Sequence, residues 1–301
     1  MNKKHITHIL ILLIIIKNVF SQSIISKTYN VENVIDYWTL EKMLNAKPML
    51  SPIGKLNKTT SNNKKSRLLT SLSDSDSINP DGESDNLLTV GKLFYTSSGK
   101  DLSCTASVID TSDGNTGITA AHCLYFKGEY SKNVIFAPGY NNGPSALGTI
   151  PVTGLSVPKS YIESWADDDY AAIKFDYPGK LQIQTGCFGW GLTPSSPVSI
   201  AIFGYPHNGD MNCIKDGNNC CVWRGYASQE YPFGTTENPE WHVPLRIGSG
   251  ASGGPWVMKN NLPNYLGYLI GVTDYYLGEH NEYANPLNFT LIRILINWPQ
   301  N

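Results

Sequence analysis

The sequence predicts an all-β fold with room for two small barrels and one helix at the C-terminus. From Leu87 onwards, short apolar runs are separated by Gly, Pro, Asn and Asp, which is the pattern of short strands joined by turns. Strands do not alternate with helices in this region, as they would in a parallel sheet. The clearest helical spacing in this region lies close to the chain end.

Five stretches have the length and apolar content of strands, namely residues 103–109, 134–136, 170–175, 198–203 and 265–272. The C-terminal helix is expected to have Asn285 as its cap and Pro286 in its first turn. Its apolar face comprises Leu287, Leu291, Ile294, Leu295 and Trp298. These elements are sufficient for one folded unit.

Residues 1–21 are expected to be a signal peptide. The start is basic at Lys3 and Lys4, residues 9–16 form an unbroken apolar run, and Ser21 suits the last position before cleavage. This run is much shorter than the ~20 apolar residues of a membrane span. We therefore expect a secreted, soluble protein with no membrane partner, and an uncleaved short anchor is the alternative.

Residues 22–85 are interpreted as a propeptide that precedes a domain of residues 86–301. Residues 34–49 have the spacing of a short amphipathic helix. Residues 51–85 are rich in Ser, Asn, Lys and Asp, and contain too few apolar residues to offset the entropy of ordering them. We expect a disordered linker there, with the basic residues 64–67 as a candidate processing site. In the alternative, the linker stays attached to the mature protein.

Composition limits the compartment and the partners. Six cysteines, all after the signal peptide, indicate an oxidising compartment and up to three disulfides. The sequons at Asn57 and Asn288 predict a glycoprotein. The net charge of −2 gives no support for binding to nucleic acid.

Two short motifs carry the chemistry. His122 lies in Thr-Ala-Ala-His-Cys (119–123), and Ser252 lies in Gly-Ala-Ser-Gly-Gly-Pro (250–255). A serine hydroxyl is a poor nucleophile unless an imidazole takes its proton and a carboxylate orients that imidazole. Asp167, Asp168 and Asp169 lie between the two motifs, and Asp169 directly precedes an apolar strand in which it can be buried.

Over roughly residues 91–298 these features resemble the trypsin/chymotrypsin-like serine peptidases, in particular the secreted glutamyl endopeptidase-like and related microbial branches. The resemblance implies two six-stranded antiparallel β-barrels and a serine-type endopeptidase that cleaves protein or peptide substrates through an acyl-enzyme. It implies that His122, Asp169 and Ser252 are catalytic, and that the amides of Gly250 and Ser252 form the oxyanion hole. No metal or cofactor is implied, and we expect a monomer.

The resemblance also implies a disulfide between Cys104 and Cys123, which fixes the loop that carries the histidine. Cys187, Cys213, Cys220 and Cys221 are expected to form two more bridges, whose pairing the sequence leaves open. Adjacent cysteines rarely pair, so we expect Cys213 to bond to one of the last two and Cys187 to the other. A zinc site is disfavoured because no suitably spaced histidine accompanies these cysteines.

Several positions differ from the family pattern. Ala251 stands where animal trypsins have the aspartate that pairs with a newly cut N-terminus, so activation cannot use that salt bridge. Arg246 stands at the base of the primary pocket of trypsins, where it would favour acidic substrate side chains; an exposed arginine at a strand end is the alternative. Ile247 and Thr273 replace the threonine and histidine of glutamyl endopeptidases, so a preference for glutamate does not carry over. Residues 271–275, with Thr273, are expected to form a wall of the substrate cleft.

Two other functions compete with the peptidase interpretation. Residues 250–254 also fit the Gly-x-Ser-x-Gly motif of α/β-hydrolase esterases, but that fold requires the order serine, acid, histidine and a helix after the serine. A catalytically inactive binding module with a protease fold is the second alternative. Ala251 and the unfamiliar pocket favour it, whereas the presence of all three catalytic side chains counts against it.

Overall fold

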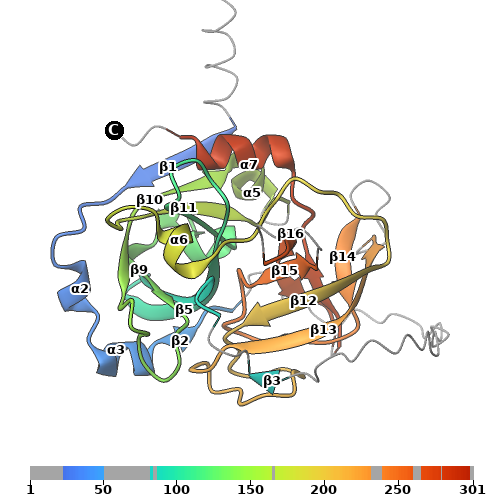
Figure 1. Ribbon diagram of the computed structural model, residues 1–301, viewed down its shortest axis with the longest axis horizontal. Helices are drawn as coiled ribbons and strands as arrows, with labels where there is room; N and C mark the ends of the chain where they lie inside the picture. Colours follow the sequence, from blue (N-terminus) through green and yellow to red (C-terminus); the bar gives the residue numbers. More distant parts are fainter. Residues whose placement is uncertain are drawn as a thin grey trace, which may run out of the picture.

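The computed structural model describes residues 23–50, 82–83, 87–164, 167–231, 239–259, 266–278 and 280–298. The predicted signal peptide, the candidate processing site and the first sequon lie outside these ranges. Two curled, mainly antiparallel sheets lie beside each other, and the chain forms the first before it enters the second (Figure 1).

The first sheet closes into a barrel of six antiparallel strands. The strands are β4 (Val90–Ser97), β5 (Lys100–Val108), β6 (Thr116–Thr119), β9 (Lys132–Pro138), β10 (Ile150–Pro158) and β11 (Ala171–Phe175). Their order is β10-β11-β6-β5-β4-β9, and β9 pairs back with β10 to close the barrel. Apolar side chains such as Leu93, Phe136 and Ile173 fill its interior, since alternate residues of each strand point inwards.

In the second sheet, seven strands pair side by side in one continuous row. They are β16 (Tyr268–Val272), β15 (Pro255–Met258), β12 (Val198–Gly204), β13 (Cys221–Glu230), β14 (Glu240–Val243), β18 (Glu282–Ala284) and β17 (Tyr275–Tyr276), in that order. It curls without pairing its first and last strands among the described residues, and β3 (Gly82–Glu83) pairs with β13. The predicted all-β, two-barrel fold class is confirmed, although only the first sheet is a closed barrel.

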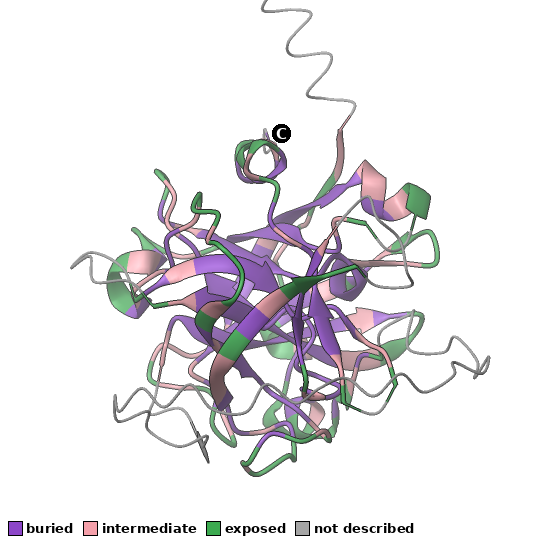
Figure 2. Ribbon diagram, turned by 90° about the vertical axis from the view of Figure 1, so that its right-hand side faces the viewer, coloured by how far each residue is buried: buried purple, intermediate pink, exposed green. Residues whose placement is uncertain are grey.

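The strands contain most of the buried residues, whereas exposed residues concentrate in loops and on the short helices (Figure 2). The interior divides into three apolar clusters: one inside the first barrel, one within the second sheet, and one between the two sheets and under the terminal helix. Within the described ranges, no helix is both long enough and apolar enough to cross a bilayer.

The N-terminal segment packs on the first barrel. Strand β1 (Ile24–Thr28) pairs with β10, and β2 (Lys47–Pro48) pairs with β5. The single helix predicted over 34–49 is instead two short helices, α2 (Val34–Tyr37) and α3 (Leu40–Asn45). They separate because the Thr39 side chain caps α3 by accepting a hydrogen bond from the N–H of Lys42.

Four further helices connect the sheets or cover them: α4 (Ala121–Leu124), α5 (Lys159–Ser164), α6 (Leu181–Thr185) and α7 (Phe289–Ile296). The C-terminal helix α7 is present, but the prediction that Asn285 caps it is wrong. Asn288 is the cap, because its side chain accepts hydrogen bonds from the N–H groups of Thr290 and Leu291. The Ser156 hydroxyl of β10 donates to the carbonyl of Leu295 and fixes α7 on the first barrel (Figure 1).

Candidate active site

His122 lies on α4, directly after the strand β6. The apolar residues Ala120 and Ala121 draw this turn into the interior, so the imidazole is fully buried. Cys123 forms a disulfide with Cys104 of β5, which ties the turn to the neighbouring strand. The position of His122 is thus set by a buried turn and by a covalent crosslink.

Asp169 contacts His122 through both of its carboxylate oxygens. Its Oδ2 lies 2.7 Å from Nδ1 of His122, and its Oδ1 accepts the backbone N–H of His122 at 2.8 Å. Asp169 lies two residues before the start of β11, which pairs with the strand β6 that leads to the histidine. Of the three adjacent acids, Asp167 is exposed and Asp168 accepts hydrogen bonds from Ser160 and Tyr170 instead.

The surroundings of Asp169 keep it ionised. Burial opposes ionisation, but the attraction of His122 and the hydrogen bonds that Asp169 accepts from His122 hold the pKa of Asp169 below its ordinary value. Its backbone N–H donates to Oδ1 of Asn285 at 2.7 Å, which fixes the start of β11. A buried anion held in this way orients the imidazole and favours its protonated form during a reaction.

Ser252 lies on a tight loop that is clamped against the first barrel. Its carbonyl accepts the N–H of Thr105 at 2.8 Å. The next residue, Gly253, has φ +79° and comes so close to Thr119 that an added Cβ would lie 2.1 Å from the Thr119 hydroxyl. Only glycine fits there, and its contact places the serine loop against the strand that leads to His122.

The nitrogen of His122 that faces away from Asp169 is buried as well. No described side chain, Ser252 included, forms a hydrogen bond with Nε2 of His122. A hydrogen bond between nucleophile and base is often absent or long before substrate binds. The backbone contacts place Ser252 beside the histidine turn, and the hydroxyl is not yet bonded to the ring.

The loop before Ser252 presents unused backbone donors. Gly250 has φ +93°, and a Cβ at this position would lie 2.6 Å from the carbonyl oxygen of Tyr205, so glycine is required. Thr105 donates its hydroxyl to the Gly250 carbonyl at 3.0 Å, which fixes the orientation of that peptide. Within the described ranges, the N–H groups of Gly250 and Ser252 donate to no protein acceptor. Both are available to an oxyanion.

The two residues predicted to bind substrate lie in different settings. The Thr273 side chain is buried, and its hydroxyl accepts a hydrogen bond from Nε1 of Trp256, so it belongs to the interior of the second sheet. Arg246 is half-buried, and its guanidinium lies 4.2 Å from the ring centre of Tyr276. Its charge is attracted to the buried carboxyl group of Glu282. Substrate contact by either residue stays a prediction.

Asp274 and Asn285 contribute to this site and were not predicted to do so from the sequence. We expected Asp274 in a wall of the cleft, but it is buried behind Asp169. A ring nitrogen of His122, a carboxylate oxygen of Asp169 and a carboxylate oxygen of Asp274 all lie within 4.8 Å of one another. The available signal was an acidic residue two positions after the apolar run of β16. Asn285 carried no such signal, because its partner Asp169 is 116 residues away in the chain.

The expectation of two further disulfides needs correction. Cys213 and Cys221 form a bridge, whereas Cys187 and Cys220 keep their thiols. The reason is spatial. Cys187 packs against the first-barrel cluster, whereas the Cys220 side chain faces the cluster between the sheets. Two cysteines in separate cores cannot bring their sulfurs within bonding distance.

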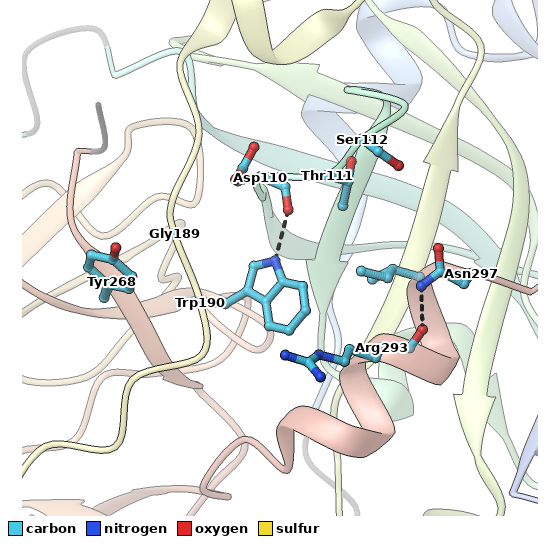
Figure 3. A pocket seen from close by; sticks show the side chains of 9 residues that line it. Asp110, Thr111, Ser112, Gly189, Trp190, Tyr268, Arg293 and Asn297 are labelled. Carbon is cyan, nitrogen blue, oxygen red and sulfur yellow. Dashed lines mark hydrogen bonds between the residues drawn. The ribbon is translucent and has the colours of Figure 1, made fainter. Parts of the chain in front are cut away.

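A cavity of about 530 Å³ lies away from these residues, between the segment that links the sheets and α7. It is lined by Asp110, Thr111, Ser112, Gly189, Trp190, Tyr268, Arg293, Ile296 and Asn297 (Figure 3). Nε1 of Trp190 donates to the carbonyl of Asp110 at 2.8 Å. None of the candidate catalytic residues lines this cavity, so it lies outside the candidate active site.

Residues 88–298 match the Trypsin family model, and the chain therefore belongs to the trypsin family of serine-type endopeptidases. The solved structure of the protease Anisep from Arthrobacter nicotinovorans is similar, with 25% sequence identity and a TM-score of 0.61 over 71% of this chain and 96% of that one. A thermostable serine protease, AL20, from an extremophilic microorganism has 22% identity and a TM-score of 0.58 over 69% and 95% of the two chains. A Glu endopeptidase has 20% identity and a TM-score of 0.56 over 73% and 96%. No curated protein sequence matches this chain.

Proposed function

We propose that the protein is a secreted serine endopeptidase that uses His122, Asp169 and Ser252 as its catalytic triad. The contact of both Asp169 oxygens with His122 is the observation that carries this proposal. It supplies an oriented, buried base in a chain whose serine loop is clamped against the same strands. The two disulfides suit an oxidising compartment, and the proposed enzyme acts as a monomer on protein or peptide chains.

In the proposed mechanism, the Ser252 hydroxyl attacks the carbonyl carbon of the scissile peptide bond. Nε2 of His122 takes the hydroxyl proton and then donates it to the departing amine, while Asp169 stabilises the imidazolium. The N–H groups of Gly250 and Ser252 hold the negative oxygen of the tetrahedral intermediate. A donor of this kind contributes about 3 kcal/mol to the transition state. In the second half of the reaction, water attacks the acyl-enzyme while His122 takes its proton. His122 then returns the proton to the departing Ser252 oxygen.

A fluorophosphonate probe tests the proposal against the inactive binding module, because the probe reacts with an activated serine and not with an ordinary one. We expect stoichiometric labelling that peptide mapping places on Ser252. The Ser252→Ala variant is the matched control and should show no labelling. Folded, processed protein that fails to react would favour the binding module.

We further propose that residues 22–85 act as a propeptide and make the protein a zymogen. The backbone N–H of Met49 donates to the carbonyl of Ser103 at 3.0 Å, next to the disulfide of the histidine turn. The ring of Pro48 lies 3.4 Å from the point where a Cβ of Gly250 would stand. The segment thus borders the proposed oxyanion hole, and its continuation leads into the predicted linker. Its presence there would hinder a substrate on that side of the site.

Cleavage within residues 51–81 should by itself leave the N-terminal fragment bound, so relief of the proposed block also requires that the fragment dissociate. The fragment buries Trp38 and Met43 and contributes the five-residue strand β1 to the first sheet. After limited proteolysis, we expect both pieces to co-elute in native size-exclusion chromatography and to separate in denaturant. In Trp38→Ala, which should lose about 3–5 kcal/mol of packing energy, the fragment should dissociate. Separate elution of the wild-type pieces under native conditions would contradict this expectation.

A further inference from the structure

Asp274 is a buried carboxyl group directly behind the Asp169–His122 pair. It follows β16, and its backbone N–H donates to the carbonyl of Tyr283 at 3.2 Å. Only 1% of the residue is exposed. Within the described ranges, neither side-chain oxygen of Asp274 accepts a hydrogen bond from an N–H or O–H donor. An ionised carboxylate in this setting would have lost its hydration without compensation.

The groups around Asp274 offer little to stabilise a second negative charge. The titratable groups that interact electrostatically with Asp274 are Asp169, Glu240, Glu282, Tyr161 and Tyr275, and His122 also lies close to it. Nδ1 of His122 is already engaged by Asp169. Burial raises the pKa of Asp274 well above its ordinary value, and the negative Asp169 beside it raises it further.

The two carboxyl groups are buried close together, because one oxygen of each lies within 4.8 Å of the other. Two ionised carboxylates at this distance repel each other, and a hydrogen bond between them requires that one of them carry a proton. Asp169 is unsuited to carry it, since both of its oxygens already accept hydrogen bonds from His122. The proton therefore belongs to Asp274, which has no other donor to accept from.

We propose that Asp274 is a positioning residue that stays protonated at neutral pH and donates a hydrogen bond to Asp169. Asp169 is then held by three donors: the backbone N–H of His122, the ring of His122, and the carboxyl group of Asp274. The inference rests on the proposed triad, because its consequence is a fixed carboxylate behind the catalytic imidazole. A protonated Asp274 orients Asp169 without adding charge to the site.

The charge state of Asp274 has a consequence that can be measured. An ionised Asp274 within 4.8 Å would favour the protonated imidazole, and the acid limb of the kcat/KM profile would lie at higher pH. A neutral Asp274 would have no such effect. Replacement by the neutral, isosteric asparagine therefore distinguishes the two states.

In Asp274→Asn, whose side-chain amide can donate to Asp169, we expect the acid limb to move by less than about 0.3 pH unit and kcat to stay within about threefold of the wild type. Asp274→Ala removes the donor and should lower kcat about tenfold or more with little change in KM. A shift of the Asp274→Asn acid limb by about one pH unit or more towards acid would overturn the proposal, because it would reveal a lost negative charge.

Infrared difference spectroscopy of wild type minus Asp274→Asn at pH 7 provides a readout that is independent of activity. The proposal requires the loss of a protonated-carboxyl C=O band, and the loss of an ionised-carboxylate band would refute it. If Ser252 fails to react with the fluorophosphonate probe, the proposed function fails while this spectrum still decides the state of Asp274.

Wild-type activity should survive treatment with a chelator. A loss that a divalent cation restores would mean that an ion, not a proton, lies between the carboxyl groups.

Discussion

Replacement of Ser252 by alanine should lower kcat by about six orders of magnitude and leave KM nearly unchanged. Without the hydroxyl, no acyl-enzyme can form, and the remaining groups can only assist attack by water. The proposed oxyanion donors of Gly250 and Ser252 persist in the variant, because alanine keeps the backbone N–H. A residual rate of roughly 10³–10⁴ over the uncatalysed reaction is therefore expected.

The measurement is steady-state hydrolysis of a peptide-library substrate identified with the wild-type enzyme. Ser199→Ala is the matched control, since Ser199 is exposed on β12 and should retain full activity. Circular dichroism and the melting temperature confirm that both variants fold. Retention of more than about one per cent of wild-type kcat by Ser252→Ala would assign the nucleophile to another residue.

Replacement of Asp169 by asparagine should lower kcat about 10⁴-fold at neutral pH. The carboxylate accepts from Nδ1 of His122 at 2.7 Å and so leaves Nε2 free to act as the base. An asparagine amide can present its N–H₂ group to Nδ1, which places the imidazole in the wrong tautomer for proton removal from Ser252. Substrate binding should change little, because the residue is buried behind the ring.

The matched control is Asp168→Asn, one residue earlier in the chain. Asp168 accepts from the hydroxyls of Ser160 and Tyr170 and, within the described residues, forms no hydrogen bond with His122, so its replacement should change kcat by less than about threefold. Equal losses in the two variants would mean that charge near this strand end, and not contact with the imidazole, supports activity.

The pKa of Asp169 is lowered in the fold. Its contribution to stability is thus present above the unfolded value of 3.8, and is lost as the pH falls through the lower folded value.

Local sequence was sufficient for the features whose cause is local. The expected strands 103–109 and 198–203 correspond to β5 and β12. Their apolar runs and flanking turn residues favour strand formation without reference to distant parts of the chain. Asp169 could be singled out from its two acidic neighbours, since it alone directly adjoins an apolar strand. The motifs around His122 and Ser252 marked both residues before any spatial information.

Local pattern failed where a polar side chain had a choice of distant partners. Asn285 and Asn288 both suit a helix cap. Asn288 caps the helix, whereas the side-chain oxygen of Asn285 accepts the backbone N–H of Asp169 instead. Cys187 and Cys220 were expected to help form two bridges, but they face different apolar clusters. In each case the outcome depends on which cores the two sheets create when they pack.

The sequence by itself determined the two-sheet class, the order histidine, acid, serine, and the glycines that the serine loop requires. Only the tertiary structure decided that Asp274 lies beside Asp169 and that Pro48 lies beside Gly250. The physical reason is that strand formation and tight turns follow from a few adjacent residues. The environment of a buried carboxyl group follows instead from chain segments about a hundred residues apart, which meet only when the barrels close and pack.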